Sequence, residues 1–127
     1  MGESRETKQK KIIQKEIDSM SFFFTAEELY AQVSKIDKNI GIATVYRFLR
    51  DLKKNRKIHF YVCNRKALYS LKNMNHSHFV CESCGKIDHL NINLVDFLKN
   101  FISGEICHFQ IEVNGVCDFC RKRNLYK

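Results

Sequence analysis

The sequence predicts an α+β fold in which a helical, basic first half precedes a smaller half that is organised around cysteines. Two observations carry this prediction. Apolar residues recur at helical spacing through residues 6–55 and then alternate with polar residues, as they do in strands. Two Cys-x-x-C pairs follow, Cys81 with Cys84 and Cys117 with Cys120. At 127 residues, the chain forms one domain or two very small ones.

Three helices are expected before residue 56. The first runs from about Glu6 to Met20, with its apolar residues on one face. The second opens with Thr25-Ala-Glu-Glu28, a capping box in which each residue of the pair satisfies the other's backbone N–H. The third runs from about Gly41 to Asn55. Its outward residues are expected to be Thr44, Tyr46, Arg47, Arg50 and Lys54.

After the third helix, the hydrophobic period changes to two. Residues 58–63 alternate in the manner of a strand, the polar Asn64-Arg65-Lys66 forms a turn, and Ala67 to Leu71 returns as a second strand. Three helices followed by a two-stranded hairpin make a winged helix-turn-helix, in which the third helix enters the major groove of DNA. We expect this domain over residues 1–72.

Charge supports a nucleic-acid partner for this first half. The chain carries a net charge of +8, and nearly all of the excess lies before Ala67. Such an asymmetry favours a polyanion, and double-stranded DNA fits better than a membrane surface. The outward residues of the third helix, with Arg65 in the wing, are therefore the candidate DNA contacts, although each alone could belong to an ordinary solvated helix face.

The two cysteine pairs predict one structural Zn²⁺ site with four thiolate ligands. Cys81-Glu-Ser-Cys84 and Cys117-Asp-Phe-Cys120 have the spacing with which two thiolates hold a tetrahedral zinc ion. Disulfides and buried apolar thiols are the alternatives. The charged N-terminus contains no apolar signal segment, so we expect a cytoplasmic, reduced chain in which zinc is favoured over disulfides.

The second half, residues 73–127, is too short to bury a stabilising core by itself, so a metal, a partner subunit or both must stabilise it. An apolar helix in this half would supply a dimer contact. Its apolar residues are Leu94, Val95, Phe97, Leu98, Phe101 and Ile102. The complete prediction is an N-terminal winged helix-turn-helix followed by a small α/β dimerisation domain with a four-cysteine zinc site.

Four segments resemble the ferric uptake regulator (Fur) family of metal-responsive transcriptional regulators. They are Gly41-Ile-Ala-Thr-Val-Tyr-Arg-Phe-Leu, Lys66-Ala-Leu-Tyr69, His76-Ser-His-Phe-Val-Cys-Glu-Ser-Cys-Gly-Lys-Ile and Ile111-Glu-Val-Asn-Gly-Val-Cys-Asp-Phe-Cys. The resemblance spans roughly Thr7 to Cys120 in the family's order. It implies a homodimeric repressor of metal homeostasis genes that binds a palindromic, AT-rich operator when a metal co-effector is present.

The resemblance also implies a second, regulatory divalent metal. His76 and His78 match the family's hinge histidines, and His89 stands where an acidic residue is common. The sequence departs from the family pattern at Ser70 and Phe23, where a carboxylate and a histidine usually bind the metal. Three imidazoles with few carboxylates favour zinc or ferrous iron, with nickel and cobalt also suited, over harder ions.

The remaining cysteines and the other function classes complete the predictions. Cys63 is either a further soft ligand or a buried thiol, and for Cys107 a buried thiol is favoured. An enzyme is not expected, because a site closed by four thiolates offers no open position and the chain has no His-Glu-x-x-His motif. The alternative function is a peroxide- or redox-sensing regulator with the same fold.

Overall fold

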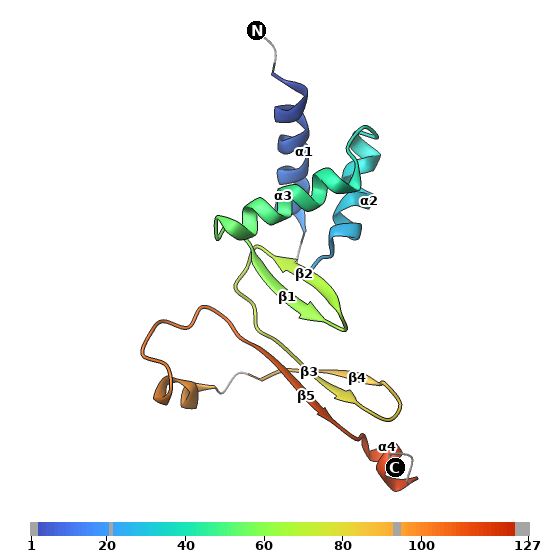
Figure 1. Cartoon of the computed structure of the whole chain (residues 1–127), viewed down its shortest axis with the longest axis vertical. Coiled ribbons are helices and arrows are strands. Elements are labelled where there is room, and N and C mark those ends of the chain that lie inside the picture. The colour runs from blue at the N-terminus through green and yellow to red at the C-terminus, as the bar shows by residue number, and fades with distance from the viewer. Residues whose placement is uncertain (1–2, 21, 93–94, 124–127) are drawn as a thin grey trace. The chain divides into compact units, whose positions relative to one another are not determined.

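The structure is a computed structural model that describes residues 3–20, 22–92 and 95–123. The fold is α+β, as predicted, and the chain divides into two compact units, Met1–Asn73 and Met74–Lys127. Figure 1 labels the α-helices and strands of both units. None of the described helices combines the length and the apolar character that a bilayer-spanning segment requires.

The first unit begins with three helices, α1 (Arg5–Ser19), α2 (Ala26–Ile36) and α3 (Ile42–Lys54). The bounds of α1 and α3 agree with the predicted segments to within one residue, and α2 begins directly after the predicted capping residue Thr25. The predicted capping box is present, because the Thr25 side chain accepts from the Glu28 N–H while the Glu28 carboxylate accepts from the Thr25 N–H. These bonds satisfy two N–H groups that a helix start leaves open, and they fix where α2 begins.

The helices pack around one apolar core, to which the loop before α2 and the hairpin also contribute. Its buried members are Ile13, Ile17, Phe24, Ala26, Leu29, Val33, Ile40, Val45, Leu49, Ile58 and Tyr69. On α3 the fully buried residues, Val45 and Leu49, lie four positions apart. The core therefore holds one face of α3 and leaves its opposite face to solvent.

The hairpin consists of β1 (His59–Cys63) and β2 (Lys66–Ser70), joined by Asn64 and Arg65. Both turn residues have positive φ, 51° and 65°, as a two-residue turn requires if it is to match the twist of its strands. The predicted turn also included Lys66, which instead pairs with Cys63 in the first rung of the ladder.

Two contacts attach the hairpin to the helices. Phe24 and Tyr69 exchange two backbone hydrogen bonds of 3.0 and 2.8 Å, so the segment before α2 is joined to β2 by an isolated antiparallel β-bridge. The ammonium group of Lys53 lies 3.6 Å from the centre of the Phe60 ring. These contacts fix the wing relative to α3 within the unit.

The second unit contains a three-stranded sheet in the order β4-β3-β5. Its strands are β3 (His76–Cys81), β4 (Ile87–Leu90) and β5 (Gln110–Gly115). The central strand β3 runs antiparallel to β4 and parallel to β5. A short helix, α4 (Asp118–Lys122), follows β5.

The apolar helix predicted near residues 94–102 is largely wrong. Over the described residues 95–102, the structure has one short 3₁₀ helix, η1 (Asp96–Asn100), and Leu94 lies outside the described residues. No side chain caps its start, and Phe97 and Phe101 are 56% and 82% exposed. Because most helical stability comes from packing an apolar face, a segment whose aromatic rings meet solvent in the single chain does not extend into an α-helix.

The second unit has little core of its own. Among its described residues, 74–92 and 95–123, the buried side chains are His76, Ser77, His78, Cys81 and Cys120. These are histidines, a serine and cysteines, and the described part of the unit buries no aliphatic residue and no Phe, Tyr or Trp. Apart from Ser77, the buried side chains in the described part of this unit are of types that bind metals, whereas the core of the first unit is apolar.

Candidate metal centres and nucleic-acid interface

The four predicted zinc cysteines converge in the second unit. Their sulfur atoms all lie within 4.8 Å of one another. Cys81 ends β3, and Cys84 lies in the tight turn that follows, where Gly85 adopts a φ of 79° that other residues rarely tolerate. Cys117 precedes α4 and Cys120 lies within it. The fold thus brings two sequence-distant turns to one point.

The geometry and electrostatics of this cluster fit zinc. The Sγ atoms of Cys84 and Cys117 are 3.9 Å apart, close to the edge of about 3.8 Å in a tetrahedron with Zn–S bonds of about 2.3 Å. The backbone N–H groups of Cys117 and Cys84 both donate to Cys81 Sγ at 3.4 Å and lower the pKa of that thiol to about 6. Burial raises the pKa of Cys120 to about 12, so this thiol needs a cation to ionise at neutral pH.

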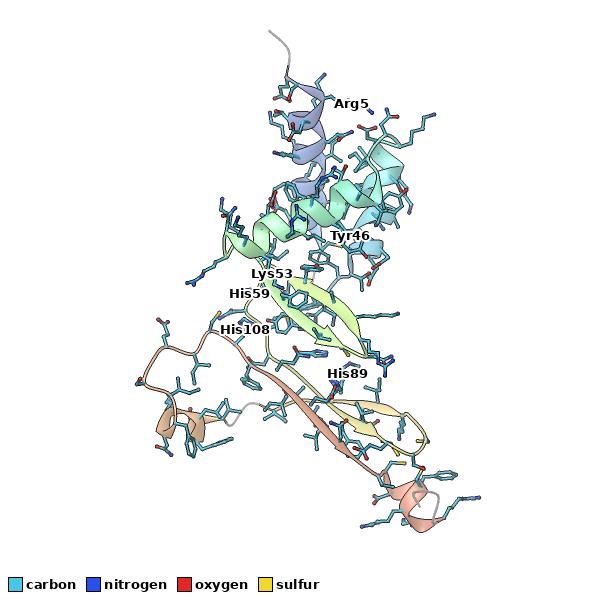
Figure 2. The ribbon with its side chains drawn as sticks, in the orientation of Figure 1. Arg5, Tyr46, Lys53, His59, His89 and His108 are labelled. Carbon is cyan, nitrogen blue, oxygen red and sulfur yellow. The ribbon has the colours of Figure 1, made fainter. Side chains whose placement is uncertain are left out.

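The three candidate regulatory histidines gather on one face of the sheet. His76 and His78 are two residues apart on β3 and therefore share a face, and His89 on β4 stands directly opposite His78. The ring centres lie 5.3 Å apart for His76 and His78, 5.4 Å for His76 and His89, and 6.2 Å for His78 and His89. Figure 2 labels His89 on its strand.

One ring nitrogen of His78 has a hydrogen-bond partner, and the other has none among the described residues. Its side chain is 0% exposed, and Nε2 lies 2.9 Å from Oε1 of Glu112, which stands opposite it on β5. Its Nδ1 is buried without a hydrogen-bond partner in the part of the chain that the structure describes. The hydrogen bond with His78 holds the pKa of Glu112 below its ordinary value, with a smaller contribution from Asn114.

Neighbouring imidazoles are a donor set that suits a divalent metal of borderline softness. Burial, and then the neighbouring histidines His78 and His89, lower the pKa of His76, which favours the neutral imidazole that a metal requires. Glu112 was not found from the sequence. The alternating pattern of residues 110–115 indicates a strand, but the sequence does not reveal that this strand pairs in parallel with β3 and sets Glu112 beside His78.

The two positions that depart from the family pattern have other contacts in the first unit. The Ser70 hydroxyl, at the end of β2, accepts from the Lys72 N–H at 3.1 Å. Phe23 packs edge-on against Tyr61, with ring centres 4.9 Å apart. Neither side chain is a usual metal ligand, so both positions serve the wing and its attachment.

Two cysteines, Cys63 and Cys107, lie outside the four-cysteine cluster. Cys63 is half-buried at the end of β1, and its role as a ligand stays a prediction. The prediction that Cys107 is buried is wrong, because this residue is exposed and lies in the loop before β5. The His108 Nδ1 lies 3.3 Å from the Cys107 Sγ.

The predicted DNA contacts on α3 lie on its solvent side. Tyr46, Arg47, Arg50 and Lys54 are exposed, and Thr44 is half-buried. The Arg47 guanidinium donates to the Thr44 hydroxyl at 3.1 Å. Figure 2 shows Tyr46 on the outer face of α3.

The wing turn lies beside this face of α3. Tyr46 and Arg65 line one open groove of about 590 Å³, together with residues at the start of α2. Arg65 is exposed at the tip of the hairpin. Tyr46 from α3 and Arg65 from the wing turn therefore line the same groove of the first unit.

Comparison with known proteins supports the same interpretation. Residues 2–113 match the model of the ferric uptake regulator family. The chain is 30% identical to the ferric uptake regulation protein of Campylobacter jejuni, over 96% of this chain and 83% of that protein. It is 28% identical to the peroxide-responsive repressor PerR of Staphylococcus aureus, over 94% of this chain and 84% of that protein.

A solved structure of FurB from Mycobacterium tuberculosis, described as a zinc uptake regulator, has the same fold with a TM-score of 0.52 and 26% identity. The alignment covers 92% of this chain and 95% of that one. The family model spans most of the chain, including the winged helix, the histidine cluster and the first cysteine pair. The chain therefore belongs to the ferric uptake regulator family of transcriptional regulators.

Proposed function

We propose that the chain is a metal-responsive, DNA-binding repressor of metal homeostasis genes that acts as a homodimer. Residues 1–72 bind double-stranded DNA, and residues 73–127 dimerise and bind metal. The exposed cations of α3 and the wing support the first assignment, and the apolar residues that the second unit exposes support the second. We place this activity in the cytoplasm, where DNA and reduced thiols occur together.

The observation that carries the proposal is the histidine cluster. Three imidazoles from two strands share one face of the sheet, and His78 Nδ1 is buried without a partner among the described residues. A buried imidazole nitrogen without a partner is costly unless another group uses its lone pair. A divalent cation held by His76, His78 and His89 would use it. The four-cysteine cluster is a separate site. Its zinc ion therefore has a structural role, and the ion in the histidine cluster responds to the metal concentration in the cell.

The second metal acts by population shift. A ligand can move an equilibrium only by its differential affinity for two states, so the metal must bind the DNA-competent dimer more tightly than other forms. A coupling of about 1–3 kcal/mol, or about 5- to 150-fold in DNA affinity, is the usual range for such control. Because the histidines outnumber the carboxylates, we expect zinc or ferrous iron to act at lower concentration than manganese.

The test is operator affinity measured while metal is varied. Fluorescence anisotropy with the chain's own promoter fragment, with the structural zinc retained, would be recorded as zinc, ferrous iron or manganese is added. We expect one metal to tighten binding and His76→Ala or His78→Ala to abolish that response. Ser77→Ala is the matched control, because Ser77 lies between the two histidines but faces the other side of the strand.

Specific binding that no metal alters would overturn the metal-responsive function. The same promoter titration would test the operator, which we propose to be palindromic and AT-rich. Half-site mutations that leave affinity unchanged would contradict the palindrome. We expect no hydrolytic activity, because neither candidate site pairs an open metal position with an assigned general base.

A peroxide-sensing regulator is the second candidate. The observation that favours it is the 28% identity to the peroxide-responsive repressor of Staphylococcus aureus. In this alternative, the histidine cluster holds ferrous iron and peroxide oxidises its ligands, or the cysteines lose zinc and oxidise. Peroxide would then release the iron-loaded protein from DNA but leave the zinc-loaded protein bound. Equal insensitivity of both forms would exclude the iron-dependent version.

A further inference from the structure

We infer that Glu112, supported by Asn114, fixes the His78 imidazole in the tautomer that carries its proton on Nε2, so that His78 presents Nδ1 to the regulatory metal. This inference rests on the proposed function and names a residue that the pattern of metal ligands does not include. Glu112 is a positioning residue here and not a ligand.

The register of the sheet brings these residues together. His78 lies on β3, and Glu112 stands opposite it on the parallel strand β5, so both side chains project from the same face. The His78 Nε2 and the Glu112 Oε1 are 2.9 Å apart. The Asn114 amide, two residues along β5 and on the same face, donates to the other carboxylate oxygen at 3.4 Å. The carboxylate is thus held from two sides.

Only one protonation state of His78 suits these contacts. If the proton were on Nδ1, the Nε2 lone pair would face a carboxylate oxygen and repel it. If both nitrogens carried protons, the buried Nδ1–H would have no acceptor among the described residues. With the proton on Nε2, the imidazole donates to Glu112, and the Nδ1 lone pair remains for a cation.

A metal-binding histidine usually donates its second N–H to a carboxylate or carbonyl group, which orients the ring and makes it a stronger ligand. Losing such a partner lowers metal affinity by about 10- to 100-fold. Here the carboxylate is on β5, while the histidines are on β3 and β4. The third strand of the sheet therefore contributes to the metal site without providing a ligand.

The first test determines the tautomer directly, without regulatory metal. Two-bond ¹H–¹⁵N correlation spectra of the ¹⁵N-histidine-labelled protein, with structural zinc bound, distinguish a protonated Nε2 from a protonated Nδ1 for each ring. We expect His78 to carry its proton on Nε2 in the wild type and to lose that preference in Glu112→Ala. A wild-type His78 protonated on Nδ1 would overturn the inference.

The second test measures metal affinity at the histidine cluster by competition with a chelating dye. We expect Glu112→Ala to weaken binding by about 10- to 100-fold. Glu112→Gln should weaken it less, because the amide oxygen still accepts from Nε2–H. Asp88→Ala is the charge-matched control, since Asp88 lies on β4 next to His89 in sequence and faces the other side. We expect it to leave affinity within about twofold of wild type.

The outcomes separate this inference from the proposed function. If the wild-type protein binds only the structural zinc, the proposed regulatory site is refuted. The tautomer of His78 in the NMR experiment still decides whether Glu112 positions the ring. A wild type that binds a second metal, with Glu112→Ala matching Asp88→Ala in affinity, refutes the inference and leaves the regulatory site intact. Equal losses in Glu112→Ala and Glu112→Gln would also refute it, because they would indicate an effect of charge alone.

Discussion

Tyr46 donates its hydroxyl hydrogen to the Glu27 carboxylate, and this bond joins the exposed face of α3 to the first turn of α2. It restricts a side chain that we place against DNA. The bond to Glu27 raises the pKa of Tyr46, and the bond to Tyr46 lowers the pKa of Glu27. Both shifts mean that the pair is a neutral phenol and an ionised carboxylate at neutral pH.

The first prediction concerns the pH range of this bond. It is lost as pH falls through the lowered pKa of Glu27, and it is lost as pH rises through the raised pKa of Tyr46. An NMR titration of tyrosine ring carbons should show Tyr46 ionising above the ordinary pKa of about 10. In Glu27→Ala, Tyr46 should return toward that value. An unchanged Tyr46 titration in this variant would show that Glu27 does not hold the phenol.

The second prediction is that α3 reads the operator. Arg47→Ala should weaken specific binding about tenfold or more, because a guanidinium aimed at a base edge contributes discrimination. Anisotropy with operator and scrambled duplexes gives the measurement, and the scrambled duplex should lose less. Lys35→Ala is the control, because Lys35 is exposed near the end of α2 and outside the proposed surface. If Arg47→Ala binds the operator as wild type does, α3 is not the recognition helix.

The third prediction assigns Arg65 to the phosphate backbone. Removing one phosphate contact should reduce the slope of log affinity against log salt concentration by about one. Arg65→Asn is the suitable variant, because asparagine tolerates the positive φ of this turn position. The slope would be measured between low and physiological salt. An unchanged slope would remove the wing turn from the interface.

The fourth prediction concerns the structural zinc. Cys120→Ser should lose the bound zinc, and with it the dimer, because the described part of the second unit buries almost nothing except metal-binding side chains. Metal analysis and sedimentation measure both effects. Cys107→Ser is the control, since this exposed thiol lies outside the four-cysteine cluster. A Cys120→Ser protein that retains zinc and dimerises would contradict the assignment.

The fifth prediction tests metal preference. His89→Glu places a carboxylate in the histidine cluster and should shift selectivity from zinc toward manganese, because carboxylates suit harder ions. Competition titrations with both metals give the ratio of affinities. Asp88→Asn, at the neighbouring position, should leave that ratio unchanged. A His89→Glu ratio equal to wild type would show that His89 does not bind the metal.

Local features could be predicted from the sequence. The capping box at Thr25 and the helical face of α3 depend on neighbours within a few residues, so their positions follow from the sequence alone. The zinc site could also be predicted, because each Cys-x-x-C pair is a local motif with the spacing of zinc ligands. Only the approach of the two pairs to one another depends on the tertiary fold.

Features that depend on pairing between distant segments could not be predicted. Glu112 meets His78 only because β5 runs parallel to β3 in one particular register. The Phe24–Tyr69 bridge likewise joins residues that no local pattern relates. In β1 the buried residue is Tyr61, whose ring packs edge-on against Phe23, while Val62 is 45% exposed. The helix predicted near residue 97 was wrong, since it lacks packing in a single chain.

The shortage of buried hydrocarbon in the described part of the second unit links the regulator's lifetime to its abundance. Phe97, Phe101 and Ile102 stay exposed in a single chain, and in the homodimer that we propose a second subunit covers them. Folding of this half is then a bimolecular event, and its completion depends on protomer concentration. Newly made chains below that concentration are open to proteolysis, whereas paired chains persist. A cell would therefore maintain a working stock of the protein only above a threshold rate of synthesis.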